Sequence, residues 1–416
     1  MNNNISSTKE TGIKLWQKIL IGMVLGGILG VVLGPNSEVL KPIGTLFINA
    51  IKMLIVPLVF CSLIVGITSM KDTAKMGRVG IKSIVLYLLT TALAISIGLM
   101  LATVFSPGDG LNMVAENAPA DKAAPDFIQT ILNIVPTNPV EALVSGNILQ
   151  IIFFALSLGV ALTLIGEKAK PTIALFESLA EAMYKLTALV MKFAPYGVFA
   201  LMAWVTGKYG LDVLLPLVSL IALVYAGCIL HVLFVYSGMV SVFGGLTPVR
   251  YLRGIINPAA VAFTTTSSSG TLPATIKAAR DELGVSKGIA SFVLPLGATI
   301  NMDGTALYQG VCALFIAQAF NIDLAMSDYL LIILTSTLAS IGTAGVPGAG
   351  LIMLSLVLTT LGLPLEGLAI VAGIDRILDM ARTSVNVCGD LMVSVLVSKS
   401  EQELDEAVYY KHPVTA

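Results

Sequence analysis

The chain has 416 residues, of which 56% are hydrophobic and only 12% are charged, and its mean hydropathy is +0.91. Soluble domains carry about 25% charged residues, so this composition predicts an integral membrane protein. A net charge of −1 without any clustered basic residues excludes nucleic acid as a partner. The four cysteines lie in apolar stretches without CxxC spacing, which argues against a disulfide framework or a zinc site.

Eight apolar stretches are long enough to cross a bilayer, which takes about 20 residues of helix. They cover residues 15–35, 40–69, 80–106, 147–166, 176–207, 212–243, 290–320 and 368–398. Lysine and arginine residues before the first stretch and between the second and third place both connections in the cytoplasm. The acidic connection between the third and fourth stretches is expected outside.

Two further apolar segments, residues 255–276 and 330–362, are interrupted by serine, threonine, glycine and proline. Basic residues flank both ends of the first segment, whereas acidic residues flank both ends of the second, so neither is expected to cross. Each is predicted to enter and turn back, from opposite faces of the membrane. Two such units, each followed by a helix with buried polar residues, indicate an inverted repeat whose site lies near the midplane.

One helical stripe carries the densest charge in the apolar part of the chain. Asp375, Asp379, Arg382, Asn386 and Asp390 follow at spacings of three or four residues, so one helix presents them on one face. Each charge in a bilayer costs about 2.5–3.5 kcal/mol on insertion scales, so the stripe must face protein, water, ions or a ligand. Arg382 offers a planar fork for a carboxylate, Asp379 suits an ammonium group, and Asn386 can donate to a second carboxylate.

The alternative interpretation of the stripe is a set of internal ion pairs. Asp379 could pair with Arg382, which is three residues away on the same helix face. Asp375 could pair with Arg376, its neighbour in the sequence. Such pairs would neutralise the charges without any ligand.

Oxygen-rich side chains in the same region suit a hard cation. Asn301, Asp303 and Asp390 offer amide and carboxylate oxygens, and sodium is favoured over a transition metal because no histidine is expected nearby. His231 lies in a different span and is expected to be a core or interface residue, with a proton relay as the other possibility. Further oxygens come from the third span, at Tyr87, Thr90 and Thr91.

The serine-rich run before Pro273 does not predict an enzyme. It lacks a GxSxG nucleophile elbow and a nearby histidine base. The many glycines and methionines elsewhere are attributed to helix packing.

Four long motifs resemble one known family, the glutamate transporter homologues or dicarboxylate/amino acid:cation symporters. They are Ser267–Pro273, Gly297–Thr305, Gly342–Gly350 and Asp379–Asp390, and the resemblance extends from Trp16 to Ser398. It implies an all-α polytopic membrane protein with eight transmembrane helices, two re-entrant helical hairpins, inverted repeats and an elevator-type mechanism. It also implies a homotrimer in which a mobile transport domain slides on a scaffold.

The resemblance divides the chain by residue range. Residues 1–76 and 111–210 would form the scaffold, residues 77–110 and 211–400 the transport domain, and residues 401–416 a cytoplasmic tail.

The resemblance also assigns roles residue by residue. Arg382 would bind the substrate's side-chain carboxylate, Asp379 its amine, and Asn386 with Ser268 its α-carboxylate. The full substrate set would be Ser267, Ser268, Thr305, Val346, Gly350, Asp379, Arg382, Thr383 and Asn386. Three sodium ions per substrate would bind at Gly297, Asn301, Asn386 and Asp390, at Thr299, Ser340, Ile341 and Thr343, and at Tyr87, Thr90, Thr91, Asn301 and Asp303.

This chain departs from the family at one arginine. Archaeal members place it before the serine-rich tip, where this chain has Thr266, and eukaryotic members place it where this chain has Met380. Arg376 lies one helical turn before Met380, so we expect it to take over that role and steady Asp379.

These features predict a sodium-coupled symporter for L-aspartate or L-glutamate, a multi-pass protein of a prokaryotic inner membrane in contact with lipid. A proton-coupled glutamate symporter or a C4-dicarboxylate symporter is the nearest alternative. A neutral amino acid carrier is disfavoured because Arg382 would be buried without an anion. An anion channel and an intramembrane hydrolase are the more distant possibilities.

Overall fold

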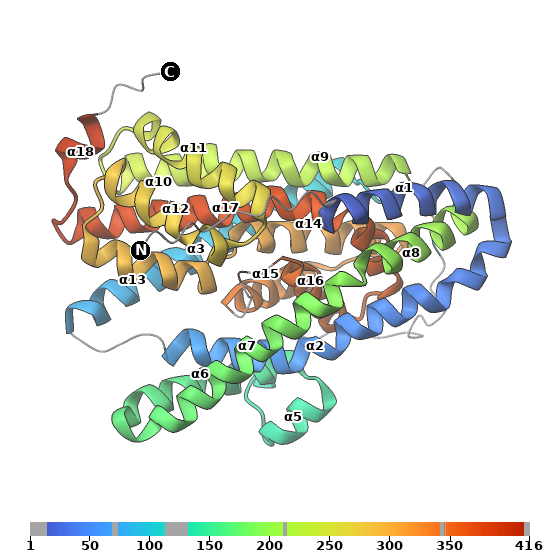
Figure 1. The fold of residues 1–416 in the computed structure, drawn as a ribbon, viewed down its shortest axis with the longest axis horizontal. Helices are drawn as coiled ribbons and strands as arrows, with labels where there is room; N and C mark the ends of the chain where they lie inside the picture. Colours follow the sequence, from blue (N-terminus) through green and yellow to red (C-terminus); the bar gives the residue numbers. More distant parts are fainter. Residues whose placement is uncertain are drawn as a thin grey trace, which may run out of the picture.

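The computed structural model describes residues 15–68, 74–111, 113, 132–210, 214–341, 345 and 347–411, and this part of the chain is helical without any strand (Figure 1). The first half contains α1 (Leu15–Leu33), η1 (Gly34–Leu40), α2 (Lys41–Thr68), α3 (Ala74–Phe105), α5 (Pro139–Ser145), α6 (Ile148–Ile165), η2 (Gly166–Ala169), α7 (Lys170–Lys192) and α8 (Ala194–Tyr209). The second half contains α9 (Leu214–Leu230), η4 (His231–Tyr236), α10 (Ser237–Val242), α11 (Pro248–Thr265), α12 (Ser268–Asp281), α13 (Lys287–Ile300), α14 (Asp303–Ala319), α15 (Met326–Ile341), α16 (Ala349–Leu361), α17 (Glu366–Ser400) and α18 (Glu406–Lys411).

Five stretches of the described helices are long and apolar enough to cross a membrane. They are Gln17–Thr68, Gly77–Phe105, Gln150–Lys192, Leu215–Val242 and Glu366–Ser400. The prediction of one continuous span over residues 290–320 is wrong, because extended backbone at Asn301 (φ −93°, ψ 101°) separates α13 from α14. The span expected over residues 176–207 is likewise two helices, since Pro195 lies in the first turn of α8 and cannot donate a backbone hydrogen bond to a longer helix.

Both interrupted segments form pairs of packed helices. In the first pair, α11 ends where Thr266 adopts a left-handed conformation (φ 51°), and Ser267 then caps α12 by accepting a hydrogen bond from the Gly270 amide at 3.0 Å. In the second pair, α15 and α16 pack together, and Gly348 precedes α16 with φ 83°. These turns bring small and hydroxyl residues to the tips, as the sequence predicts.

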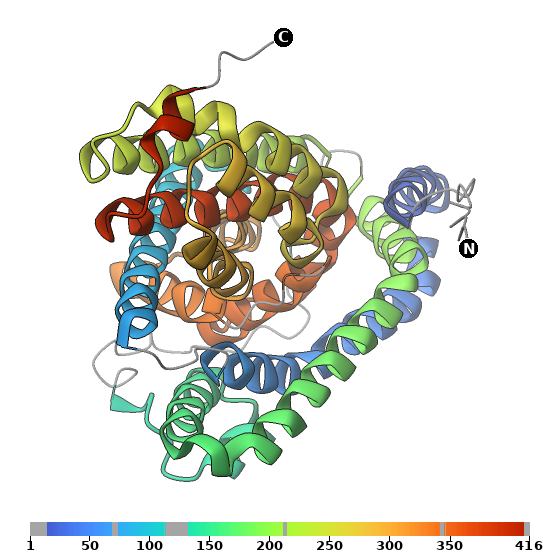
Figure 2. The ribbon, with the colours of Figure 1, turned by 60° about the vertical axis from the view of Figure 1, so that its left-hand side comes forward.

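The helices fall into two groups that lie side by side (Figure 2). α1, α2, α6, α7 and α8 pack on one another as a long arm. α17 lies at the centre of the other group, where it packs against α9, α11, α12, α13 and α14. It also contacts α8 and α1 of the arm, so the charged stripe lies close to the boundary between the groups.

Glu401 directly follows α17 and holds its C-terminal end to the N-terminal part of α3 through an ion cluster. Glu401 accepts hydrogen bonds from Arg78 (2.6, 3.1 and 3.2 Å) and from Lys82 (2.7 Å). These hydrogen bonds, from Arg78 first and then Lys82, lower the pKa of the Glu401 carboxyl to about 2. A depressed folded-state pKa contributes stability above the ordinary pKa that is lost only as the pH falls toward 2, so this cluster persists at neutral pH.

Close contact between α1 and α8 depends on a stripe of glycines. Gly22, Gly26 and Gly30 are spaced four apart, and a Cβ atom at any of them would collide with a backbone carbonyl oxygen of α8. The colliding oxygens belong to Pro195, Phe199 and Ala203. Small residues at this spacing let two membrane helices approach at backbone distance, which confirms helix packing as the role of these glycines.

We therefore expect Gly26→Ala to destabilise the arm by about 1–3 kcal/mol, the usual range for overpacking. Gly27→Ala is the matched control, because the nearest atom to its added Cβ is the Thr206 methyl at 4.0 Å. The apparent Tm in detergent should fall for Gly26→Ala and stay level or rise for Gly27→Ala. Equal melting temperatures for the two variants would contradict the close packing.

Candidate functional site

The predicted stripe lies on one uninterrupted helix, α17, and its polar side chains are buried. Asp375, Asp379, Arg382, Asn386 and Asp390 are each at most 5% exposed. Because α17 sits inside the second helix group, the stripe faces other protein elements rather than lipid. Its charges therefore have to be compensated by neighbouring groups.

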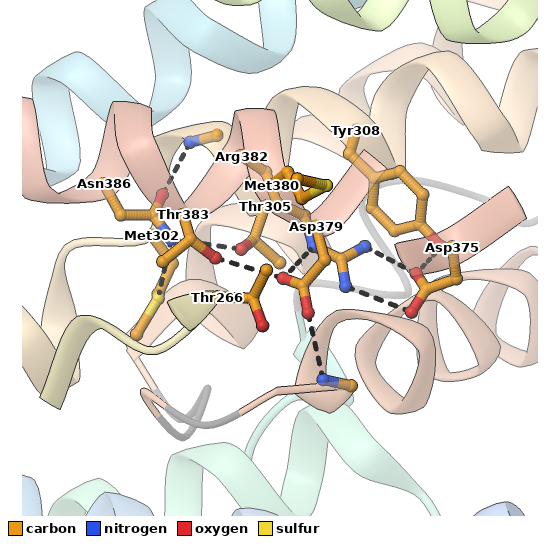
Figure 3. Close-up of polar contacts among 12 residues, drawn as sticks. Thr266, Met302, Thr305, Tyr308, Asp375, Asp379, Met380, Arg382, Thr383 and Asn386 are labelled. Carbon is orange, nitrogen blue, oxygen red and sulfur yellow. Dashed lines mark hydrogen bonds and ion pairs between the residues drawn. The ribbon is translucent and has the colours of Figure 1, made fainter. Parts of the chain in front are cut away.

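Arg382 is paired with two carboxylates of its own helix (Figure 3). Its guanidinium donates to Asp375 at 2.7 and 3.3 Å and to Asp379 at 2.9 Å. The guanidinium carbon also lies 4.5 Å from the centre of the Tyr308 ring, whose hydroxyl donates to Asp375 at 3.3 Å. The alternative of an Asp379–Arg382 pair is thus realised, whereas Asp375 pairs with Arg382 and not with Arg376.

Two glycines allow neighbouring helices to pack directly against Arg382. A Cβ added at Gly350, in the first turn of α16, would lie 2.5–2.8 Å from the guanidinium group. A Cβ at Gly304, in α14, would press on the backbone of Arg382 itself. The second hairpin therefore approaches the guanidinium at a distance that only glycine permits.

Asp379 and Asn386 connect the stripe to the neighbouring segments. Asp379 accepts hydrogen bonds from the Thr383 hydroxyl at 3.1 Å and from the Gly348 amide of the second hairpin at 3.2 Å. Asn386 accepts from the Gly304 amide at 2.8 Å and donates to the Thr305 hydroxyl at 3.3 Å. These bonds tie α17 to the start of α14 and to the tip before α16.

The two hairpin tips meet over the stripe. The Ser267 hydroxyl and the Ser269 amide both donate to the Gly345 carbonyl, at 2.7 and 3.3 Å. Beneath them lies a cavity of about 10 Å³. It is lined by Thr266, Ser268, Met302, Thr305, Gly345, Ala349, Gly350, Asp379, Thr383 and Asn386. A cavity of this size holds about one water molecule, so an amino acid can enter only if a tip moves.

Oxygen-bearing residues of the first predicted cation set lie together. The Asn301 amide donates to Asp390 at 2.9 Å and to the Asn386 carbonyl at 3.1 Å. A Cβ at Gly297 would collide with the Asp390 carboxylate and lie 2.6 Å from the Tyr87 hydroxyl, so the three groups are adjacent. The Asn301 side-chain oxygen is buried and accepts no hydrogen bond in the described part of the chain. An orphaned amide oxygen beside a buried carboxylate fits a hard cation such as sodium.

The third predicted set is only partly assembled, and it has neighbours that the sequence did not reveal. Thr91 donates to Asp303 at 2.5 Å, whereas the Thr90 hydroxyl bonds the carbonyl of Tyr87 in its own helix. The expectation that no histidine lies near is wrong, because the His231 ring nitrogen lies 3.4 Å from Asp303. η4 packs against α3 and α17 and so carries this ring into the site.

The structure describes only part of the second predicted sodium set. Thr299 and Ser340 bond carbonyls of their own helices, at Leu296 and Thr337. Thr343 and the Ile341 side chain lie outside the described residues, as does Val346 of the predicted substrate set.

Arg376 lies at the edge of the site without bonding the residue that it was expected to steady. It lines a second cavity of about 10 Å³ between α17 and the arm, together with Asp375 and Asp379 of α17 and Phe47 and Met191 of the arm. Its Nε atom is buried without a hydrogen-bond partner, and no ion pair joins Arg376 to Asp379 in the described part of the chain. The expected role in steadying Asp379 therefore has no direct contact to support it.

Comparisons with known proteins agree along nearly the whole chain. The model of the sodium:dicarboxylate symporter family matches residues 15–400. The proton/sodium-glutamate symport protein of Geobacillus stearothermophilus is 40% identical over 403 residues, which cover 94% of this chain and 95% of that protein. The proton/glutamate-aspartate symporter of Escherichia coli is 39% identical over 422 residues, with 96% of each chain covered.

A third relative is named for a different substrate. The C4-dicarboxylate transport protein of Bacillus subtilis is 36% identical over 398 residues, which cover 94% of each chain. Every one of these relatives is a transporter rather than an enzyme. With its apolar spans and its buried charged site, this chain is a multi-pass membrane transporter that belongs to the sodium:dicarboxylate symporter family.

Proposed function

We propose that the protein imports L-aspartate or L-glutamate together with sodium ions. The observation that carries this proposal is the charge balance around α17. Four buried carboxylates, at Asp303, Asp375, Asp379 and Asp390, accompany the buried guanidinium of Arg382 and the partly buried guanidinium of Arg376. Uncompensated charge in the membrane interior is expensive, so an acidic substrate can enter this site only together with cations.

The substrate would exchange for existing contacts rather than fill an open space. The substrate's side-chain carboxylate would replace Asp375 as the acceptor of hydrogen bonds from the Arg382 guanidinium. The substrate's ammonium group would bind Asp379. The Asp379 bond to Gly348 and the Ser267 bond to Gly345 would break as a hairpin tip opens. The α-carboxylate would then meet the hydroxyl and amide donors of Ser268, Thr383 and Asn386.

Coupling would follow from shared contacts between the two halves of the site. Asn386 bonds Thr305 on the substrate side, and its carbonyl accepts from Asn301 on the cation side. A cation at Asn301 and Asp390 would therefore fix the backbone and side chain of Asn386 in place for the substrate. Two ligands that stabilise the same arrangement raise each other's affinity by the same factor.

The arrangement of the helices supports an elevator division of labour. In this proposal the arm of α1, α2, α6, α7 and α8, whose helices pack on one another, would be the scaffold, and the group around α17 would be the transport domain. In a homotrimer built on the arm, the α17 group would carry substrate and three sodium ions as one body.

Asp379→Asn distinguishes an amino acid site from a C4-dicarboxylate site. Loss of the carboxylate should weaken aspartate binding at least about 10-fold, in line with the larger worth of hydrogen bonds to charged groups, and should leave succinate binding unchanged or tighter. Affinities measured by calorimetry in sodium buffer check this, with the exposed Asp323→Asn as the matched control. Equal weakening of aspartate and succinate, or wild-type binding of succinate as tight as aspartate, would contradict the assignment.

Uptake into proteoliposomes separates sodium coupling from proton coupling. We expect aspartate to accumulate under an inward sodium gradient at equal pH on both sides. An inward proton gradient in sodium-free buffer should give no accumulation above the protein-free background. Accumulation driven by protons alone would instead assign the proton-coupled alternative.

A further inference from the structure

Two side chains from a π-helical segment converge on Asp303. The Tyr236 hydroxyl donates to its Oδ2 atom at 2.7 Å, and the His231 Nε2 atom lies 3.4 Å from the same oxygen. The two rings meet edge to face, with centroids 4.6 Å apart. All three side chains are fully buried.

The helix geometry explains how both rings reach one oxygen. His231 and Tyr236 are the first and last residues of η4, a π-helical stretch between α9 and α10. In an α-helix, residues five apart point about 140° away from each other. A π-turn closes between residues i and i+5, which brings these two side chains toward one face. The segment contains neither proline nor glycine, so neither residue accounts for the irregular turn.

The two rings occupy the hydrogen-bond acceptor positions of one Asp303 oxygen, Oδ2. An ionised carboxylate only accepts hydrogen bonds, with about two positions on each oxygen. In the described part of the chain, Oδ2 receives hydrogen bonds from Tyr236 and His231, whereas Oδ1 receives one from Thr91 alone. One acceptor position of Oδ1 is therefore left without a hydrogen bond among these residues, and Thr91 belongs to α3, which also carries Tyr87 and Thr90.

The histidine is a costly choice for a purely structural position. Because Asp303 is an acceptor, the Nε2 atom carries the proton, and the Nδ1 atom is left buried without a partner in the described part of the chain. A leucine or phenylalanine would fill the same space without an unmade hydrogen bond. The His231 ring therefore leaves one buried nitrogen, Nδ1, without a hydrogen bond in the described part of the chain.

We propose that His231 and Tyr236 are positioning residues for Asp303, which hold Oδ2 so that Oδ1 serves as a monodentate ligand for a co-transported sodium ion. This inference rests on the proposed function. It assigns η4 to the cation site, although no residue of η4 belongs to the sodium sets that the sequence motifs indicate. The two residues act through Asp303 and do not touch the ion themselves.

The test measures sodium binding without transport. Thermal stability of the purified protein in detergent is followed against sodium concentration at constant ionic strength, without amino acid, for wild type, His231→Leu, His231→Gln, Tyr236→Phe and Tyr251→Phe. Tyr251 is the matched control, because it is an equally buried tyrosine that donates to the Cys388 carbonyl at 2.9 Å.

We expect His231→Leu and Tyr236→Phe to raise the half-saturating sodium concentration about 5-fold or more, since each removes a hydrogen bond to a charged group. His231→Gln keeps an N–H donor and should recover part of that loss. Tyr251→Phe should lower the melting temperature while leaving the half-saturating sodium concentration unchanged. If His231→Leu does not fold, His231→Gln and Tyr236→Phe still carry the comparison.

A sodium response in wild type that His231 and Tyr236 variants share unchanged would overturn this inference and leave the proposed function standing. Absence of any sodium response in wild type would overturn the proposed function and the inference together. A change of equal size in Tyr251→Phe would assign the effect to general destabilisation and so would also overturn the positioning role.

Discussion

The rest of the site depends on the ion pairs that Arg382 makes with Asp375 and Asp379. A guanidinium that is 1% exposed inside a membrane protein requires charge partners at hydrogen-bond distance, and Asp375 and Asp379 provide them. With Asp303 and Asp390 included, the buried carboxylates carry four formal negative charges against two positive charges, those of Arg382 and the partly buried Arg376. Under the proposed function an acidic substrate would add to that imbalance, so accompanying cations would be needed. Substrate recognition and cation coupling would then share one electrostatic origin.

The broken helices supply what that charge requires. At Asn301 the chain leaves the helix, and the side chain of Asn301 is free to reach Asp390 and the Asn386 carbonyl. At the two hairpin tips, a left-handed Thr266 and a left-handed Gly348 end or begin helices directly over the stripe. For a threonine this conformation costs about 1–2 kcal/mol. Because the cavity beneath the tips is small and Ser267 and Gly348 bond across it, the proposed function requires a tip to open before substrate enters.

The sequence predicts which residues share a face of the site better than it predicts which side chains bond one another. Helical spacing alone placed five polar residues on one buried face of α17, because the period of an α-helix is fixed. Spacing could not show that Arg382 turns toward Asp375 instead of leaving it to Arg376, since side-chain direction depends on the packing of Tyr308 and Gly350. Helical spacing also could not place His231 beside Asp303. That contact joins distant elements and depends on a π-turn, which no sequence pattern predicts. The single span expected over residues 290–320 was wrong for a related reason: a run of apolar residues does not reveal that the helix opens at Asn301 to serve the site.

If acidic substrate and sodium compensate each other's charge in one buried site, aspartate binding must depend on sodium. Calorimetric titration of the purified protein with L-aspartate at several sodium concentrations and constant ionic strength measures this dependence. We expect the aspartate Kd to fall steeply as sodium rises, with a slope greater than one on logarithmic axes because more than one ion would accompany each substrate. An aspartate Kd that does not change with sodium concentration would contradict this charge compensation.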